Sequence, residues 1–308
     1  MSIPASVSPK PVSETLRPLI PAFAGLSRFR RASRRRGVPW IPIFIITVMV
    51  SMALFAPLLA PYSPIDQTLR DKLIPPFWVE GGSMQYLLGT DAFGRDILSR
   101  LIYGARVSLL VALLALIAGG GVGLLVGIVA GYVGGAVDHV LMRLVDAAFT
   151  FPAILFALLL SVTMGQGLGT LVLAISLLLW ASFARVLRGE VLALKQRDFV
   201  ALAKVRGCSS ARIMLTHILP NVLNTFMVLV TLNIGAVIIA EASLSFLGAG
   251  IPPPTPTWGG MISDGRGRIA EAWWVALIPG IAITLLVLSV NVFGDWLRDR
   301  LDPRLRQL

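Results

Sequence analysis

The chain has 308 residues, of which 56% are hydrophobic and only 14% are charged, and its formal net charge is +11 at pH 7. Soluble domains carry about 25% charged residues, so this composition excludes an ordinary soluble protein and favours one whose surface contacts lipid. The positive charge does not indicate a nucleic-acid partner, because it is concentrated in residues 1–39 and 185–217, which flank long apolar runs as cytoplasmic loops of membrane proteins do.

Residues 1–39 form a tail rich in Arg, Pro and Ser that we expect to lie in the cytoplasm, close to anionic lipid. Six apolar runs follow, and most approach the roughly 20 residues that a membrane-spanning helix needs. They cover residues 40–60, 105–133, 140–163, 171–186, 222–240 and 273–293. An even number of spans places both termini on one side, and the positive-inside rule makes that side the cytoplasm. Residues 40–308 are thus predicted to form one polytopic, all-α membrane domain.

The second apolar run contains a regular series of glycines. They recur at a spacing of four residues: Gly119, Gly123, Gly127 and Gly131. This spacing places all four on one helix face, where small residues let membrane helices approach closely. We predict that the face packs against a neighbouring helix, the alternative being a loosely packed helix that tolerates glycine.

The basic stretch 187–220 is long for a connection between two spans, and the topology places it in the cytoplasm. Residues 190–206 contain no Gly or Pro and are predicted to form a helix. Gly207 is suited to end this helix, because the left-handed conformation common at helix C-termini costs glycine little.

A second short helix is predicted beyond this glycine. Ser209 or Ser210 would cap its start, it would run to His217, and Pro220 would then open the fifth span. Two helices joined by a sharp bend form a rigid protrusion suited to docking another protein. An ordinary interfacial helical loop is the alternative.

Residues for catalysis or metal binding are few. Cys208 is the sole cysteine, and His139 and His217 lie in different segments, so no metal, cofactor-binding or catalytic site is predicted. No Gly-x-x-x-x-Gly-Lys-Ser/Thr phosphate loop occurs, so we expect no ATP hydrolysis by this chain. A channel or secondary transporter would need ionisable groups deep in the membrane. Glu241 is the one tempting candidate, and its position near the end of the fifth run favours an interfacial or loop-side carboxylate.

The basic stretch also carries a recognisable motif. Ala201-Leu-Ala203 is followed by three residues, Gly207, nine residues and His217-Ile-Leu-Pro220. This pattern resembles the conserved cytoplasmic EAA loop of bacterial ABC importer permeases, which reads Glu-Ala-Ala, three residues, Gly, nine residues and a hydrophobic-x-Leu-Pro ending. Ala201 replaces the usual Glu and Leu202 the usual Ala, which weakens any transfer of that Glu's contacts but not of the loop's fold.

Five further motifs resemble the dipeptide/oligopeptide/nickel permease subfamily, and within it the C-type dipeptide subunit. They are GTDAFGRD at 89–96, LSRLIYGARVS at 98–108, PPPTPTWG at 252–259, AWW at 272–274 and GDWLRDRLDP at 294–303. Their order along the chain extends the resemblance over nearly everything beyond the tail.

The resemblance implies the fold of a type I ABC importer permease in a bacterial inner membrane. It implies four kinds of partner: a second permease that is not identical to this chain, two cytoplasmic ATPases that bind ATP and Mg²⁺, an external solute-binding protein, and membrane lipid. The expected cargo is di- or oligopeptides, with nickel chelates or glutathione-like solutes as alternatives. It also implies a set of residues that couple the permease to the ATPases: Ala201, Ala203, Arg206, Gly207, Arg212, Leu219 and Pro220.

The proline-dense stretch 251–260 is expected to be a stiff, ordered loop on the outer face. Together with the resemblance, this makes Glu241, Pro252 and Trp258 candidates for an outer gate or a dock for the binding protein. An inert connector is the alternative.

Overall fold

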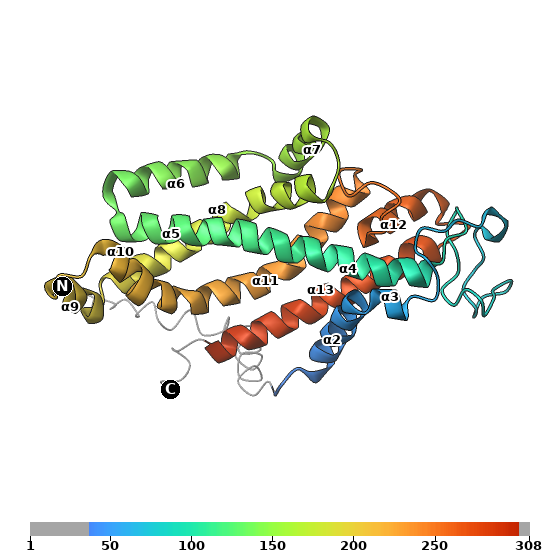
Figure 1. The fold of residues 1–308 in the computed structure, drawn as a ribbon, viewed down its shortest axis with the longest axis horizontal. Helices are drawn as coiled ribbons and strands as arrows, with labels where there is room; N and C mark the ends of the chain where they lie inside the picture. The colour runs from blue at the N-terminus through green and yellow to red at the C-terminus, as the bar shows by residue number, and fades with distance from the viewer. Residues whose placement is uncertain (1–36, 302–308) are drawn as a thin grey trace, which may run out of the picture. The chain divides into compact units, whose positions relative to one another are not determined.

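The structure is a computed structural model that describes residues 37–301 (Figure 1). The basic tail predicted for residues 1–39 therefore lies almost entirely outside the described residues. The α-helices in chain order are α2 (Trp40–Leu54), α3 (Ala56–Leu59), α4 (Ile97–Ala115), α5 (Gly121–Val133), α6 (Gly135–Thr150), α7 (Ala153–Met164), α8 (Leu168–Lys195), α9 (Asp198–Val205), α10 (Ser210–Ile213), α11 (Leu219–Phe246), α12 (Trp258–Gly265) and α13 (Trp274–Leu301). Short helical turns occupy η2 (Leu69–Asp71), η3 (Leu116–Gly120), η4 (Met214–Ile218) and η5 (Arg266–Arg268).

Each predicted apolar run is helical, but several helices extend beyond the apolar residues. The second run starts at Ile97 and not at residue 105, because the Asp96 side chain caps the helix by accepting the Ser99 N–H. The π-turn η3 then joins α4 to α5, so that helical structure continues to Val133. The fourth run, predicted over 171–186, occupies Leu168–Lys195. Charged residues near the ends of these helices interrupt the apolar pattern, so the hydropathy pattern alone gives helices that are too short.

The third run is not the single straight span that was predicted. It consists of α6 and α7, which meet at an angle of 86°. Phe151 is extended at the break because the following Pro152 disfavours helical geometry before it, and Pro152 itself has no N–H to continue the helix.

Four helical segments in the described part of the chain are long and apolar enough to cross a membrane: Ile97–Val133, Leu168–Lys195, Ser210–Phe246 and Trp274–Arg300. The bent pair α6–α7 makes a fifth if both halves belong to one span. The first run, α2, is a shorter apolar helix. The predicted count of six spans thus stays a prediction.

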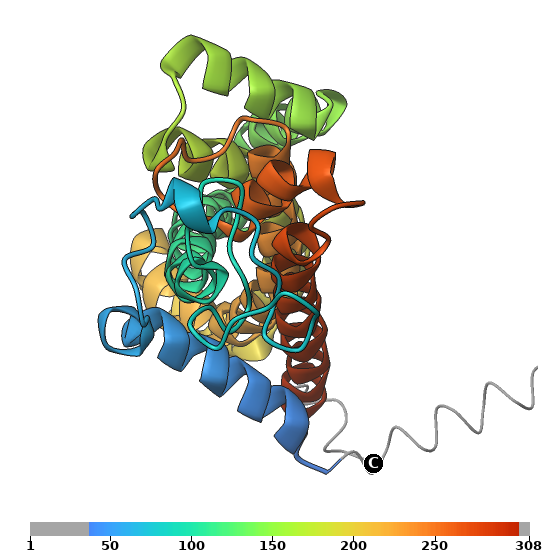
Figure 2. The same ribbon diagram turned by 90° about the vertical axis from the view of Figure 1, so that its right-hand side faces the viewer.

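The long helices α4–α5, α8, α11 and α13 run alongside one another in Figure 1. Helix α5 packs on α8, α11 packs on α13, and α2 packs on both α4 and α13. Figure 2 shows α2 and the α6–α7 pair on opposite flanks of these helices. Helices α9 and α10 lie at one end, and residues 61–96 lie with α12 at the other (Figure 1).

Candidate functional site

The first candidate site is the bend between α9 and α10. Helix α8 ends at Lys195, and a break at Gln196 and Arg197 precedes α9. The helix predicted over 190–206 is therefore two helices, not one. After α9 the chain turns at Gly207, whose φ of +74° lies in the left-handed region as expected for this position.

Two backbone hydrogen bonds close the end of α9. The Gly207 N–H donates to the Lys204 carbonyl at 2.9 Å, and the Cys208 N–H donates to the Ala203 carbonyl at 3.1 Å. This is the Schellman arrangement, in which a left-handed residue lets two amides reach back to the last turn of a helix. It gives a physical reason for the four-residue spacing between Ala203 and Gly207.

Ser209 caps the start of α10, and the helical structure that begins there continues beyond the predicted end at His217. The Ser209 hydroxyl accepts the Arg212 N–H at 3.4 Å. The π-turn η4, in which the Leu219 N–H donates to the Met214 carbonyl, then leads directly into α11. The predicted boundary at His217 is wrong: Ser210–Phe246 is one helical segment, and Pro220 lies in its interior, at the start of α11.

Helix α9 has two distinct faces. Val200 and Ala203 are buried against the protein, whereas Leu202 is 58% exposed and Val205 is 86% exposed. Among the other coupling residues named above, Ala201, Arg206, Arg212 and Pro220 are exposed and Leu219 is half-buried. An exposed apolar strip beside basic side chains is typical of a surface that contacts another macromolecule.

Tyr132, at the end of α5, connects this bend to the long helices. Its ring is buried, and two ammonium groups lie over it: Lys195 Nζ from α8 at 5.7 Å and Lys204 Nζ from α9 at 5.9 Å. Close by, the Arg188 guanidinium on α8 donates two hydrogen bonds to the Asp138 carboxylate on α6. Sequence reasoning missed these contacts, because no motif marks them.

The predicted glycine face lies against α8. A Cβ on Gly123 would be 2.5 Å from the Phe183 Cβ and 2.6 Å from the Trp180 carbonyl. Cβ atoms on Gly119, Gly127 and Gly131 would likewise come within 3.0 Å of α8 atoms. Only glycine permits this separation of the two backbones.

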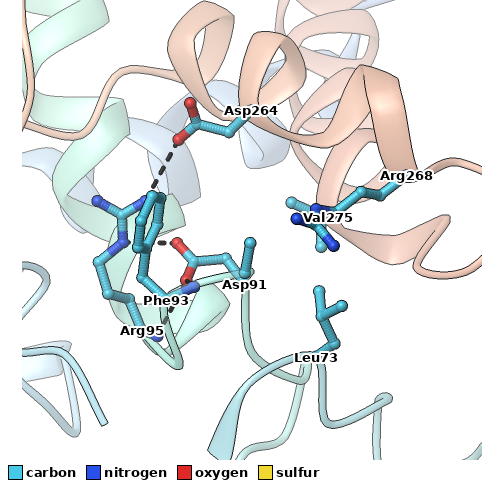
Figure 3. Close-up of a pocket in the computed structure, with 8 residues that line it drawn as sticks. Leu73, Asp91, Phe93, Arg95, Asp264, Arg268 and Val275 are labelled. Atoms are coloured by element: carbon cyan, nitrogen blue, oxygen red, sulfur yellow. Dashed lines mark hydrogen bonds and ion pairs between the residues drawn. The ribbon is translucent and has the colours of Figure 1, made fainter. Parts of the chain in front are cut away.

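The second candidate site, at the other end of the long helices, is a cluster of four charged residues. Arg95 Nε donates to Asp91 Oδ2 at 2.6 Å, and Arg95 Nη2 lies 3.3 Å from Asp264 Oδ2 (Figure 3). Arg100, in the first turn of α4, lies 3.5 Å from the same Asp264 oxygen and 3.5 Å from Asp91. Burial raises the pKa of the Asp264 carboxyl, and the neighbouring arginines partly oppose this effect.

The three outer candidates occupy different environments. Trp258 is fully buried, and its Nε1 donates to the Leu101 carbonyl at 2.9 Å, so it offers no exposed surface for docking. Pro252 is exposed and lines a hollow of about 220 Å³ together with Arg100 and Asp264.

The interpretation of Glu241 as an interfacial or loop-side carboxylate is wrong. It is fully buried within the protein, where it accepts hydrogen bonds from Ser108 on α4 and Ser245 on α11, both at 2.9 Å. Ser245 lies one turn along the same helix, but Ser108 is 133 residues away in the sequence, so no local pattern predicted that Glu241 is buried against α4. Within residues 37–301 no group of three His, Cys, Asp or Glu side chains is placed to hold a metal ion.

Comparison with known proteins agrees with this architecture. The family model for the binding-protein-dependent transport system inner membrane component matches residues 123–307, and that for the N-terminal TM domain of oligopeptide transport permease C matches residues 26–76. The chain is 45% identical over 282 residues to the dipeptide transport system permease protein DppC of Escherichia coli (strain K12), covering 92% of this chain and 94% of that protein. It is 40% identical over 264 residues to the di/tripeptide transport system permease protein DppC of Pseudomonas aeruginosa (strain UCBPP-PA14), covering 86% and 87%.

A solved structure shares the fold. It is a chain of the MetNI methionine ABC transporter in an inward facing conformation, with a TM-score of 0.55 and 16% identity, covering 66% of this chain and 96% of that one. The predicted all-α importer-permease fold is thereby confirmed. The chain belongs to the family of inner membrane components of binding-protein-dependent transport systems.

Proposed function

We propose that this chain is one of two permease subunits of an ATP-driven importer that carries di- and oligopeptides across a bacterial inner membrane. The observation that carries the proposal is the bend between α9 and α10, closed at Gly207 and presenting an exposed apolar strip. Its motif spacing is that of the loop by which such permeases dock their ATPases.

The bend is well placed to move the long helices. Helix α9 is joined to α8 by two residues, and α10 continues without interruption into α11. A displacement of α9 by a docked ATPase would therefore act on both helices at once. In this proposal two separate ATPases bind ATP and Mg²⁺, and this chain contributes the mechanical link and half of the translocation pathway.

The peptide cargo is supported by the names of the relatives, two of which are dipeptide or di/tripeptide permeases. A binding protein would deliver the peptide to the end of the protein that carries the charge cluster. The second permease subunit would be non-identical. Both termini and the bend would lie in the cytoplasm, because the basic residues are concentrated in these segments and basic loops of membrane proteins face the cytoplasm.

Reconstitution tests the proposal. The chain would be co-expressed with a second permease, two ATPases and a binding protein from the same organism, and the complex placed in liposomes. We expect ATP-dependent uptake of a labelled dipeptide that requires the binding protein. Competition by longer peptides, glutathione or a nickel chelate would rank the cargoes. Uptake without ATP, or a permease that retains no ATPase, would contradict the proposal and favour a channel or secondary transporter.

A further inference from the structure

The charge cluster near α12 contains two buried cations. Arg95 and Arg100 have side chains that are only 4% and 5% exposed. Two buried guanidinium groups this close together need two carboxylates, because an uncompensated buried charge is costly. Asp91 and Asp264 supply them, so the cluster is neutral only while Asp264 is in place.

The two carboxylates are held very differently. Asp91 is 4% exposed and is fixed by its own loop, since its Oδ1 accepts the N–H groups of Phe93 and Arg95 at 2.8 and 3.0 Å. The Asp264 side chain is 40% exposed, and its hydrogen bonds in the described structure come only from the two arginines. Asp91 is thus a permanent partner and Asp264 an exchangeable one.

Asp264 also borders two hollows in the structure. It lines both a hollow of about 250 Å³ bordered by Leu73, Phe93 and Arg268 (Figure 3) and the hollow of about 220 Å³ beside Pro252. Helix α12 packs on α11 and α13, and it contacts α4 through the buried Trp258 ring, which lies against Gly104 and donates to the Leu101 carbonyl, and through the ion pair of Asp264 with Arg100. Of these two contacts, the one made by Asp264 can break without exposing a buried aromatic ring.

We infer that Asp264 is a positioning residue of the transport cycle, a latch that holds α12 against α4 in this state and separates from both arginines in another state, in which water replaces its contacts with them. This inference rests on the proposed function, because it requires a permease that alternates between states. The latch lies at the end of the protein where the binding protein would dock. Because Asp264 lines both hollows, its release would change the space in each of them.

The latch can be weakened without changing the shape of the side chain. In proteoliposomes that hold the complete importer, Asp264→Asn should raise ATP hydrolysis measured without binding protein by roughly two- to five-fold, the range a partly exposed ion pair supports. Asp264→Glu, which keeps the carboxylate, should return the rate toward that of wild type. Glu271→Gln is the matched control, because the Glu271 side chain is 72% exposed on the neighbouring segment and its carboxylate forms an ion pair with Arg268 at 3.8 Å, outside the charge cluster.

Two results would overturn the latch: an unchanged rate in Asp264→Asn, or an equal increase in Glu271→Gln. If Asp264→Asn does not accumulate in the membrane, a second variant tests the latch with Asp264 intact. This variant is Ser263→Cys in a Cys208→Ser background, and its cysteine is labelled from outside. Its rate with an impermeant maleimide should differ between the nucleotide-free and vanadate-trapped importer, and equal rates would again overturn the latch. Absence of stimulation by loaded binding protein in wild type would instead count against the proposed function itself.

Discussion

The Asp96 side chain caps the start of α4 and is buried. Its Oδ2 accepts the Ser99 N–H at 2.8 Å and the Ser99 hydroxyl at 2.6 Å, while its Oδ1 has no hydrogen-bond partner within the described residues. Burial raises the pKa of the Asp96 carboxyl, although the Ser99 hydrogen bonds oppose this. The residue thus combines a stabilising helix cap with a charge that the folded protein accommodates poorly.

The raised pKa sets the sign of a pH effect. The folded chain holds this proton more tightly than the unfolded chain, so the contribution of Asp96 to stability is greatest below the ordinary Asp pKa of about 3.9 and is lost as pH rises through the raised value. Asp96→Asn keeps the helix cap without the charge. The difference in thermal unfolding midpoint, Asp96→Asn minus wild type, should therefore increase as pH rises. Asp96→Ala should lose about 1 kcal/mol with the cap.

Thermal unfolding of the three proteins in detergent, between about pH 4 and pH 7, checks this. Taking the difference between wild type and Asp96→Asn cancels the titration of other groups. A difference that shrinks with rising pH, or an Asn variant no more stable than the Ala variant, would contradict the assignment.

Gly207 can be tested by separating backbone conformation from bulk. A Cβ at this position would meet no atom within 4 Å, so a substitution strains the backbone, by roughly 1–2 kcal/mol, and does not clash within the chain. We expect Gly207→Val to leave the permease inserted and paired but to release the ATPases or abolish stimulated hydrolysis. Co-purification of tagged ATPase and hydrolysis in proteoliposomes measure this.

Gly207→Asn is the control, because Asn tolerates the left-handed conformation. It should retain more coupling than Gly207→Val. Normal ATPase retention and normal stimulated hydrolysis in the Val variant would refute the prediction.

At the scale of helices, the contact between α5 and α8 depends on glycine. Gly123→Leu and Gly127→Leu would force the two backbones apart, and overpacking of this kind costs about 1–3 kcal/mol or more. Gly121 lies in the same helix, but a Cβ there meets nothing within 4 Å. Gly121→Leu should therefore keep the yield and thermal midpoint of wild type, while the other two variants lower both. Equal behaviour of all three would show that this face does not require glycine.

Contacts between elements suggest how α9 acts on α5. Lys204 and Lys195 share the Tyr132 ring, but only Lys204 belongs to α9. A cation–π contact contributes about 0.5–1 kcal/mol at such a site, so Lys204→Met should lower stimulated ATP hydrolysis by roughly two- to five-fold while the ATPases stay bound. Lys195→Met should have a smaller effect, and Tyr132→Phe, which keeps the ring, should behave as wild type. Identical losses in both lysine variants would indicate a general charge effect.

The sequence predicted which stretches are helical better than where they begin or bend. Apolar length located the runs, but Arg100 and Lys195 belong to helices whose polar ends the hydropathy pattern leaves out. Pro152 was the local signal for the break in the third run, and the continuous apolar residues around it concealed that signal. The pairing of Arg95 with Asp264, 169 residues apart, depends on tertiary packing and could not be read from spacing.

Across the whole molecule, the two candidate sites lie at opposite ends of the same long helices (Figure 1). Helix α11 is continuous with α10 at one end and carries Ser245, which lines the hollow beside Pro252, at the other. Helix α4–α5 likewise runs from Arg100 in the charge cluster to Tyr132 near α9. The arrangement would let a change at the ATPase end reach the other end through rigid helices, provided that the two ends face opposite sides of the membrane.

That condition leads to the last prediction, which concerns orientation. Cys208 is the only cysteine in the chain and is partly exposed beside Gly207, so it reports the side on which the bend lies. We expect an impermeant maleimide to label it in inside-out vesicles, prepared without ATPases that could cover it, and not in intact cells. The matched control is Thr255→Cys in a Cys208→Ser background, since Thr255 is exposed in the proline-dense loop at the opposite end. This variant should show the reverse pattern, with labelling in cells. Labelling of Cys208 from outside intact cells would invert the topology, and with it the assignment of the α9–α10 bend to the ATPases, because ATP is available only in the cytoplasm.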